Sequence, residues 1–354
     1  MKIRRQSFKG IWAKVPSFMR RWYELYYYRK LIPDTLNRFL TDEERANKKY
    51  VRKIRKDLLA CRDKYKIEPN EYFWFDFRNL SDNQRGEFLT RVVKNNILQR
   101  LVGYDVENKE LRDKYHFYEM MKPFFCREVM LITGKNGNNL NDFKEFTRKH
   151  EDCFIKSNSM SKGRGAGLYH IESDEEAEKV YTKLRNAGGD WIVEEKVIQS
   201  ASVAQWNESS VNTIRLPAIL KDGRWTVFGP CFRTGRKGQV VDNASAGGMF
   251  ACINPQTGII YTDGYDDKCA KYYEKHPDSG LTFKGWQVPK WTELLVLAEK
   301  IHRTIPHHFY VGWDFALTDN GWVLIEGNWG ALLSQYNDHV GLKKKFFELL
   351  GVKE

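Results

Sequence analysis

The sequence predicts an α+β protein, in which a helical, basic N-terminal region (residues 1–104) precedes a body of mixed helices and strands (residues 105–354). Two patterns predict this class. Before about residue 105, apolar residues recur every three or four positions, as on one face of a helix. After it, short apolar segments typical of strands alternate with helical segments and glycine-containing turns. With 354 residues, of which 42% are hydrophobic, the chain can bury a substantial core.

Residues 7–30 show the pattern of an amphipathic basic helix that is interrupted near Pro16. Aromatic side chains such as Trp12 and Trp22 are interleaved there with Arg and Lys. Residues 1–30 therefore fit an anionic, cytoplasmic membrane surface, where the protein would be peripheral. They fit equally well a helix that packs on its own body or on a second protomer.

The rest of the N-terminal region is expected to be helical around a buried aromatic cluster. Pro69 precedes this cluster, which comprises the five aromatic residues between 72 and 77. Helices are expected on either side of it, from about Asp42 to Lys64 and from Asp82 to Leu101, with Ser81 as the N-cap of the latter.

The body is expected to contain shorter, alternating elements. Strands are expected at residues 129–133, 153–156, 191–198, 213–220, 225–233, 249–253, 259–262, 309–317 and 322–326, and helices at 140–149, 174–186 and 291–305. The last two strands should form a hairpin, because Asn320-Gly321 between them is a strong turn signal.

The net charge of +12 belongs to the N-terminal segment. Residues 1–60 hold 17 basic and 6 acidic side chains, whereas residues 61–354 hold 41 and 40. A nucleic-acid-binding face needs basic residues spread across it, so we expect no nucleic-acid partner. The first thirty residues contain no continuous apolar stretch, and the longest uncharged run, residues 243–262, is polar. We therefore expect neither a secretory signal nor a transmembrane helix.

The six cysteines show no CxxC pair and no histidine at metal-finger spacing. We therefore expect neither a zinc site nor a disulfide framework. Cysteines used in this way are typical of a reducing compartment, so a cytoplasmic location is expected.

The predicted hairpin carries a candidate metal site. Its turn folds Asp314 back beside Glu326, and Glu326 and Asn328 are two residues apart, so both should point to one face of the strand. Three oxygen-donor side chains on one face suit Mg²⁺ bound jointly with substrate phosphates. The alternative is that Asp314 and Asn328 merely flank turns.

Two other segments are candidate nucleotide contacts. Lys156 ends a predicted strand and precedes a loop rich in serine and glycine, which offers a cation and backbone N–H groups to a polyphosphate. The loop is no Walker A motif, because its lysine comes first, and it is equally compatible with a surface turn. Residues 191–198 form an apolar segment interrupted by Glu194 and Glu195, which can offer backbone groups to an adenine edge or be an ordinary edge strand.

Taken in order, these pieces resemble the ATP-grasp superfamily. The order is a first lysine in Asp113-Lys114, Lys156 before its loop, the segment from Glu194 to Ile198, then Asp314, and finally Glu326-x-Asn328. Further segments resemble the sugar-transfer-associated ATP-grasp family, which is similar to the alpha-L-glutamate ligases. They are Ser210 to Leu216, Arg233 to Gly238, Val241 to Asn243 with Gly247-Gly248, and His276 to Asp278.

This resemblance covers residues from about 70 to 345 and implies an ATP-grasp fold. In that fold two α+β subdomains grip ATP, here a lid of about residues 150–200 and a catalytic subdomain of about residues 201–345. Residues 1–60, in the helical N-terminal extension, do not take part in the resemblance.

The resemblance also implies roles for single residues. Lys114 and Lys156 would contact the ATP phosphates under a lid loop that contains Gly163, Gly165 and Gly167. The resemblance places four residues around adenine, the last two through backbone groups: Glu194, Glu195, Lys196 and Ile198. Asp314, Glu326 and Asn328 would hold one or two Mg²⁺ ions, or Mn²⁺ in their place. Arg215 and Arg233 would neutralise a transferred phosphoryl group or an acceptor carboxylate. His276 would lie in the acceptor pocket or be a structural histidine before a proline turn, and no residue is assigned to the ribose.

The implied activity is ATP-dependent joining of a carboxylate to an amine through an acylphosphate. The acceptor would be a uronic acid of a glycan or sugar precursor and the amine donor an amino acid, in the biosynthesis of a polysaccharide such as a capsule. Two other classes stay open. One is a kinase-like phosphotransferase acting on a sugar or glycan, and the other is a nucleotide-binding scaffold without catalysis.

Overall fold

The computed structural model describes residues 26–102, 110–134, 139–159, 166–239, 242, 247–331, 335 and 338–353. Most of the expected helix at residues 7–30 lies outside these residues, so its membrane role stays a prediction. The chain divides into two compact units, residues 1–86 and 87–354. The boundary expected after residue 104 falls in a segment that is not described.

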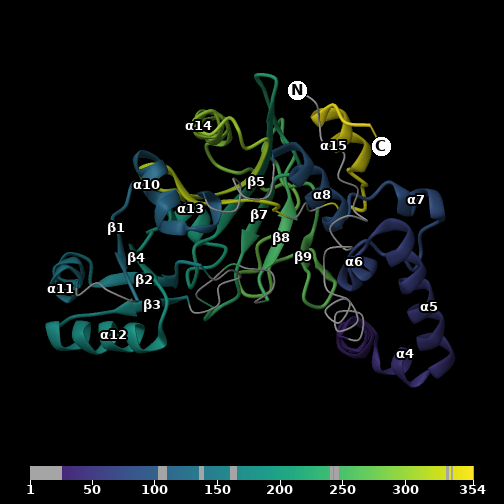
Figure 1. Ribbon diagram of the computed structural model, residues 1–354, viewed down its shortest axis with the longest axis horizontal. Coiled ribbons are helices and arrows are strands. Elements are labelled where there is room, and N and C mark those ends of the chain that lie inside the picture. The colour runs from purple at the N-terminus through teal and green to yellow at the C-terminus, as the bar shows by residue number, and fades with distance from the viewer. Residues whose placement is uncertain are drawn as a thin grey trace. The chain divides into compact units, whose positions relative to one another are not determined.

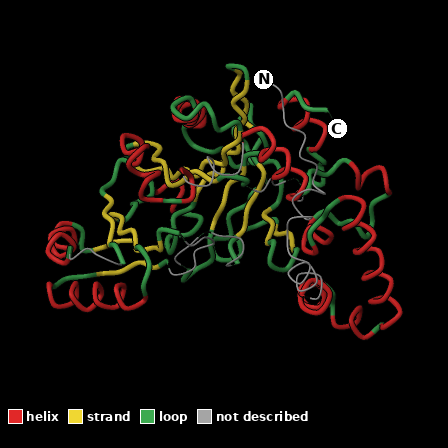
Figure 2. Tube along the Cα trace, viewed as in Figure 1, coloured by secondary structure: helices red, strands yellow, loops and turns green. Residues whose placement is uncertain are grey.

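The described part of the first unit is helical (Figures 1 and 2). Its elements are the π-helical turn η1 (Tyr27–Leu31) and the helices α3 (Ile32–Phe39), α4 (Asp42–Ala46), α5 (Lys48–Tyr65), α6 (Pro69–Trp74) and α7 (Asp82–Gly86). The single helix expected from Asp42 to Lys64 is wrong, because Asn47 divides it. The Asn47 side chain accepts a hydrogen bond from the Tyr50 backbone N–H at 3.0 Å and so caps α5.

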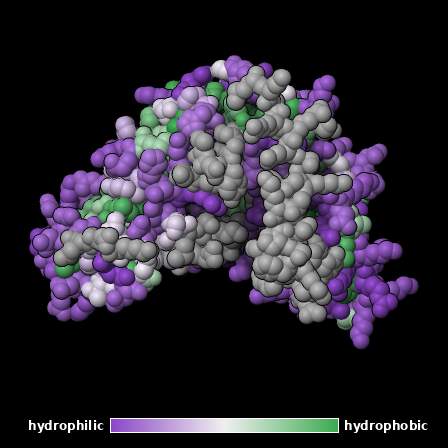
Figure 3. Space-filling model, in the orientation of Figure 1, coloured by the Kyte–Doolittle hydropathy of each residue, from purple (hydrophilic) through white to green (hydrophobic). Residues whose placement is uncertain are grey.

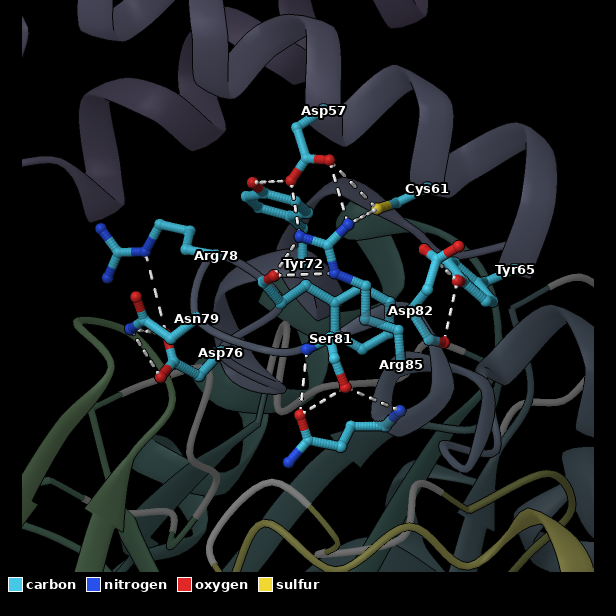
Figure 4. Close-up of polar contacts among 12 residues, drawn as sticks. Asp57, Cys61, Tyr65, Tyr72, Asp76, Arg78, Asn79, Ser81, Asp82 and Arg85 are labelled. Atoms are coloured by element: carbon cyan, nitrogen blue, oxygen red, sulfur yellow. Dashed lines mark hydrogen bonds and ion pairs between the residues drawn. The ribbon is translucent and has the colours of Figure 1, made fainter.

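An ion pair and several aromatic side chains connect the helices of this unit (Figure 4). Arg85 donates to both carboxylate oxygens of Asp57, at 3.0 and 2.8 Å, and the Tyr72 hydroxyl donates to Asp57 at 2.6 Å. Four of the five clustered aromatics are buried, as expected, whereas Trp74 is only partly buried. Ser81 exchanges hydrogen bonds with Gln84 at the start of α7, which confirms the expected N-cap.

The helix expected from Asp82 to Leu101 is interrupted. Its second half is α8 (Arg91–Val102), which belongs to the second unit. The backbone N–H of Leu89 donates to the Gln335 side chain at 3.1 Å, and the Leu89 carbonyl accepts from it at 2.6 Å. Because these backbone groups bond to a side chain 246 residues away, they are not available to an α-helical ladder.

The second unit contains two antiparallel sheets. In the smaller one, the described strands follow the order β1-β4-β2-β3, with bounds β1 (Val129–Ile132), β2 (Asp152–Ser157), β3 (Gly167–His170) and β4 (Trp191–Glu195). Helices α11 (Leu140–Lys149) and α12 (Asp174–Ala187) lie side by side and pack on this sheet through Phe143, Tyr181 and Leu184 (Figure 1). The strand expected at residues 191–198 is shorter than expected, since β4 ends at Glu195.

The larger sheet follows the order β10-β9-β8-β7-β5-β11-β12 among the described residues, with β6 paired to β5. The strands are β5 (Thr213–Lys221), β6 (Arg224–Val227), β7 (Cys231–Thr234), β8 (Met249–Cys252), β9 (Gly264–Asp266), β10 (Lys271–Tyr273), β11 (Tyr310–Thr318) and β12 (Gly321–Asn328). The strand expected at 225–233 is wrong, because Gly229, with φ +71°, and Pro230 break it in two. At 259–262 there are isolated bridges instead of the expected strand.

Helices cover both faces of the larger sheet. These are α10 (Lys114–Phe125) and α14 (Trp291–His302) on one face, and α8 and α15 (Lys343–Leu350) on the other; the short helix α13 (Ala201–Ala204) precedes β5. Along β11, Val311, Trp313 and Phe315 point into the core with α10 and α14, whereas Tyr310 points into the core with α8 and α15. Because side chains alternate along a strand, Asp314 belongs to the Tyr310 face.

Most of the surface that is coloured by hydropathy in this view is hydrophilic, with small hydrophobic patches (Figure 3). Within the described part of the chain, no helix is both long enough and apolar enough to cross a membrane.

Gly327 allows α10 to approach β12 closely. A Cβ atom at Gly327 would lie 2.9 Å from Cζ of the buried Phe117 and 3.2 Å from Trp313. We expect Gly327→Ala to lower the free energy of unfolding by about 1–3 kcal/mol, because neither ring has room to move. Urea denaturation would measure this loss. Gly86→Ala is the control, since nothing lies within 4 Å of its Cβ position, and an equal effect of the two substitutions would contradict the prediction.

Candidate active site

The candidate metal ligands lie on the hairpin of β11 and β12. Asp314 is directly opposite Glu326 on one side and opposite Arg215 of β5 on the other, so the three side chains form a row across the sheet. Asn328 is opposite Gly312, where a Cβ would collide with Ala331 at 2.2 Å. The expected convergence of Asp314, Glu326 and Asn328 is therefore present in the structure.

A β-bulge at Ile325 turns Glu326 toward this row. Phe315 is opposite Leu324 in the apolar core, but the next residue along β11, Asp314, is opposite Glu326. In a regular strand, Glu326 would face the same core as Leu324, because the two are separated by two positions. The extra residue reverses the alternation and brings the carboxylate to the polar face.

Hydrogen bonds connect the three candidate ligands. The Asn328 amide donates to Glu326 Oε1 at 3.0 Å and to Asp314 Oδ2 at 3.3 Å. Asp314 is only 2% exposed, and Glu326 and Asn328 are partly buried. Rotating the Asn328 amide by half a turn would place its oxygen, instead of its nitrogen, beside the carboxylates of Glu326 and Asp314. Two carboxylates and an amide oxygen are a donor set that fits Mg²⁺.

Two arginines surround Asp314. Arg215 donates to both of its carboxylate oxygens, through Nε to Oδ1 and through Nη2 to Oδ2, the latter at 2.7 Å. Arg233 donates to Asp314 at 3.1 Å and to Asp242 at 3.0 Å. Burial lowers the pKa of Arg215, but Asp314 outweighs burial and raises it above its ordinary value. Both guanidiniums thus lie where an anionic substrate would compete with Asp314 for them.

A buried ion-pair network surrounds Lys156 of β2. Lys156 pairs with Glu194 of β4, whose other oxygen accepts from Arg127 at 2.8 and 2.6 Å. Burial alone would raise the pKa of Glu194, but the positive charges of Arg127 and Lys156 lower it to about 2. Glu194 is therefore ionised at neutral pH and holds Lys156 by an ion pair.

Arg127 also joins the two sheets. Its Nη1 donates to the Leu324 carbonyl of β12 at 2.7 Å, one residue before the bulge. Its guanidinium stacks on the Phe125 ring at 4.5 Å. One side chain therefore contacts both the strand that carries Glu194 and the strand that carries Glu326.

Lys114 begins α10. Its Nζ donates to the carbonyls of Ser157 and Asn158, both at 3.2 Å, so Lys114 lies at the end of the strand that holds Lys156. Burial, followed by repulsion from Lys156, lowers the pKa of Lys114. The structure thus brings the two expected phosphate lysines to one strand end.

The family model of the sugar-transfer associated ATP-grasp proteins matches residues 98–347. The chain belongs to this family. Its fold is accordingly the ATP-grasp fold, which confirms the fold expected from the sequence. A comparison with curated proteins gave no match.

Solved structures similar to this ATP-grasp protein include several ligases. D-alanyl-alanine synthetase A from Vibrio cholerae is 13% identical with a TM-score of 0.38, over 62% of this chain and 55% of that one. The ATP-grasp ligase PsnB, solved with a minimal precursor, Mg and ADP, is 9% identical with a TM-score of 0.38, over 75% and 65%. N5-carboxyaminoimidazole synthetase from Staphylococcus aureus, solved with ADP, is 13% identical with a TM-score of 0.42, over 73% and 58%. The match thus spans less than two thirds of each solved chain.

The expected adenine segment of this ATP-grasp protein spans the end of β4 and the residues that follow it. The Glu195 carboxylate accepts from the Glu128 backbone N–H at 3.0 Å, and Lys196 pairs with Asp152 at 2.8 Å. Ile198 is 76% exposed. Of the lid glycines, Gly167 begins β3, whereas Gly163 and Gly165 lie outside the described residues.

His276 has a structural position. It is completely buried, and its Nε2 is 3.0 Å from the Gly235 carbonyl. Its Nδ1 accepts from the backbone N–H groups of Asp278 and Ser279, at 3.3 and 3.2 Å. An imidazole whose two nitrogens bond to backbone has no atom left for a substrate, so the acceptor-pocket role expected for His276 does not fit, and the structural alternative does.

Sequence reasoning missed Arg127 and gave Asp242 no role in the site of this ATP-grasp protein. Asp242 accepts from both Arg233 and the Thr213 hydroxyl, so it orients the arginine beside Asp314. It lies in one of the segments that carried the family resemblance. Arg127, in contrast, lies 67 residues from Glu194, and no local pattern marks it.

Proposed function

We propose that this protein is an ADP-forming, Mg²⁺-dependent ligase that joins a carboxylate to an amine through an acylphosphate. The observation that carries the proposal is the row of Glu326, Asp314 and Arg215, with Arg233 and Asn328 beside it. Such a row offers hard oxygen ligands and guanidinium donors within one site. Both are needed where a phosphoryl group is transferred to a carboxylate.

In this proposal, the oxygen-donor side chains and the basic side chains of the site have different roles. Glu326, Asn328 and Asp314 would hold Mg²⁺, which supplies charge compensation for the ATP phosphates when bound. Lys114 and Lys156 would bind those phosphates, and Glu194 keeps Lys156 in place. Arg215 and Arg233 would orient the acceptor carboxylate.

In the proposed reaction, a carboxylate oxygen of the acceptor attacks the γ-phosphorus of ATP, and the bond from that phosphorus to the leaving oxygen of ADP breaks. The amine then attacks the acyl carbon, loses a proton and expels phosphate, which leaves an amide. No side chain of the protein needs to act as a nucleophile. Positioning and electrostatic stabilisation account for catalysis.

The association of the family with sugar transfer supports a glycan or sugar precursor as the acceptor. We propose a uronic acid as the carboxylate and an amino acid as the amine, in polysaccharide biosynthesis.

An assay with ATP, Mg²⁺ and a panel of uronic acids and amino acids tests the proposal. We expect ADP and free phosphate in equal amounts only when both co-substrates are present, because the amine is needed to release the phosphate. Quantifying ADP, phosphate and the amide by mass spectrometry gives the balance.

Two outcomes would replace the ligase proposal. ADP formation without an amine, with phosphate retained on the acceptor, would indicate a kinase-like phosphotransferase. ATP binding without turnover across the panel would indicate a nucleotide-binding scaffold.

A further inference from the structure

Glu110, His307 and His308 form a cluster of metal-ligating side chains outside the proposed active site. Glu110 precedes α10 by four residues, and the two histidines lie between α14 and β11. His307 Nε2 is 2.7 Å and His308 Nε2 is 2.8 Å from the same atom, Glu110 Oε2. One ligand atom from each of the three residues lies within 4.8 Å of the others.

Two imidazole nitrogens and one carboxylate oxygen are the donors that Zn²⁺ and similar transition-metal ions prefer. These ions bind such atoms at about 2.0–2.2 Å, so neighbouring donors in a tetrahedral site are about 3.3 Å apart. The present N–O separations are somewhat shorter than that. A small outward movement of the Glu110 side chain would admit an ion between the three atoms.

The protein fixes one side of this cluster and leaves the other accessible. His308 is completely buried, and its backbone carbonyl is 2.7 Å from His302 Nε2. His302 in turn accepts a hydrogen bond from the Trp225 indole at 3.2 Å. The His307 side chain, in contrast, is 43% exposed, so an ion and a water ligand can reach the cluster from solvent.

We propose that Glu110, His307 and His308 bind a divalent transition-metal ion of the Zn²⁺ class, with water completing the coordination. The ion ties the segment that leads into α10 to the loop that leads into β11. Both connections matter to the active site, because α10 begins with Lys114 and β11 carries Asp314. The proposal does not depend on the ligase reaction.

One feature limits the affinity. Ligation through Nε2 places the remaining proton of His308 on Nδ1, which is buried and has no acceptor among the described residues. An unsatisfied buried donor weakens binding by about ten- to a hundredfold. We therefore expect a site of micromolar affinity, weaker than a site with complete outer hydrogen bonding.

Calorimetric titration of the full-length protein with Zn²⁺, in excess Mg²⁺ and without ATP, tests the site. We expect one Zn²⁺ per chain, and we expect His307→Ala to weaken its binding by at least about a hundredfold, because one of three protein ligands is lost. Glu110→Gln should weaken it as well, and since both residues are partly exposed, both variants should remain folded.

His170→Ala is the matched control. His170 also contacts two carboxylates, Asp152 and Glu172, each at 2.8 Å, but among the described residues it forms no metal-ligating cluster with a second histidine. Its loss should leave Zn²⁺ affinity unchanged. Absence of Zn²⁺ binding in the wild type, or equal affinity in wild type and His307→Ala, would overturn the proposal and leave a hydrogen-bonded cluster without a metal. Zn²⁺ binding is measured without turnover, so a failure of the proposed ligase activity would not affect this result.

Discussion

Replacing Glu326 with glutamine is expected to lower kcat for ATP turnover about 10³-fold without unfolding the protein. The amide has nearly the same shape as the carboxylate but removes one negative charge from the row with Asp314 and Asn328. A bound metal contributes several kcal/mol to such a reaction, and about 1.4 kcal/mol corresponds to a factor of ten. ADP formation at saturating ATP and Mg²⁺, with the substrate pair found by the assay above, measures the loss.

Asp319→Asn provides the matched control for this effect. Asp319 lies in the exposed turn of the same hairpin, so it carries the same charge change away from the row. Its turnover should equal that of the wild type. If Glu326→Gln retained more than a tenth of wild-type turnover, Glu326 would not be a metal ligand.

Arg127→Met is expected to lower the free energy of unfolding by about 3–5 kcal/mol. The side chains of Arg127 and Glu194 are only 3% and 7% exposed, so the substitution takes one of two paired cations from a buried carboxylate and leaves Lys156, as far as the described residues show. It also removes the donor to the Leu324 carbonyl. Chemical denaturation followed by tryptophan fluorescence measures the change.

Arg148→Met is the control for the Arg127 substitution. Arg148 pairs with Asp174 at 2.5 Å, but the two side chains are 64% and 46% exposed, so the change in unfolding free energy should stay within about 0.5 kcal/mol. Equal effects of the two arginine substitutions would show that the buried network contributes no more than a surface pair.

The same network predicts how acid affects stability. Because the pKa of Glu194 falls from 4.5 to about 2 on folding, its ionised form stabilises the folded state. This contribution is complete above about pH 4.5 and is lost as the pH falls toward 2. In Glu194→Gln, the unfolding free energy should therefore change less across this interval than in the wild type.

The sequence predicted the hairpin and the meeting of Asp314, Glu326 and Asn328, because a turn signal and strand alternation are local patterns. Lys114 and Lys156 could also be identified from the sequence, since each lies beside the end of a helix or a strand. These features depend on neighbours within a few residues, and residue order alone connects them to the family.

Three features could not be predicted from the sequence, because each depends on contacts between distant segments. Arg127 reaches Leu324, 197 residues away, and Glu110 meets two histidines about 200 residues away. Gln335 interrupts a helix 246 residues before it by bonding to Leu89. The cysteine spacing led to the expectation that the chain has no zinc site, and it contained no information about a carboxylate and a histidine pair so far apart.

Because of the bulge at Ile325, substitutions and deletions in this strand have different consequences. The side chain at Ile325 is not part of the row, so replacing it would leave Glu326 opposite Asp314. Deleting Ile325, in contrast, would keep every proposed ligand in the chain and yet direct Glu326 into the hydrophobic core. Relatives compared by residue identity alone would look intact after such a deletion. The number of residues in this segment is therefore a constraint in itself, and alignments of the segment should penalise gaps more heavily than substitutions.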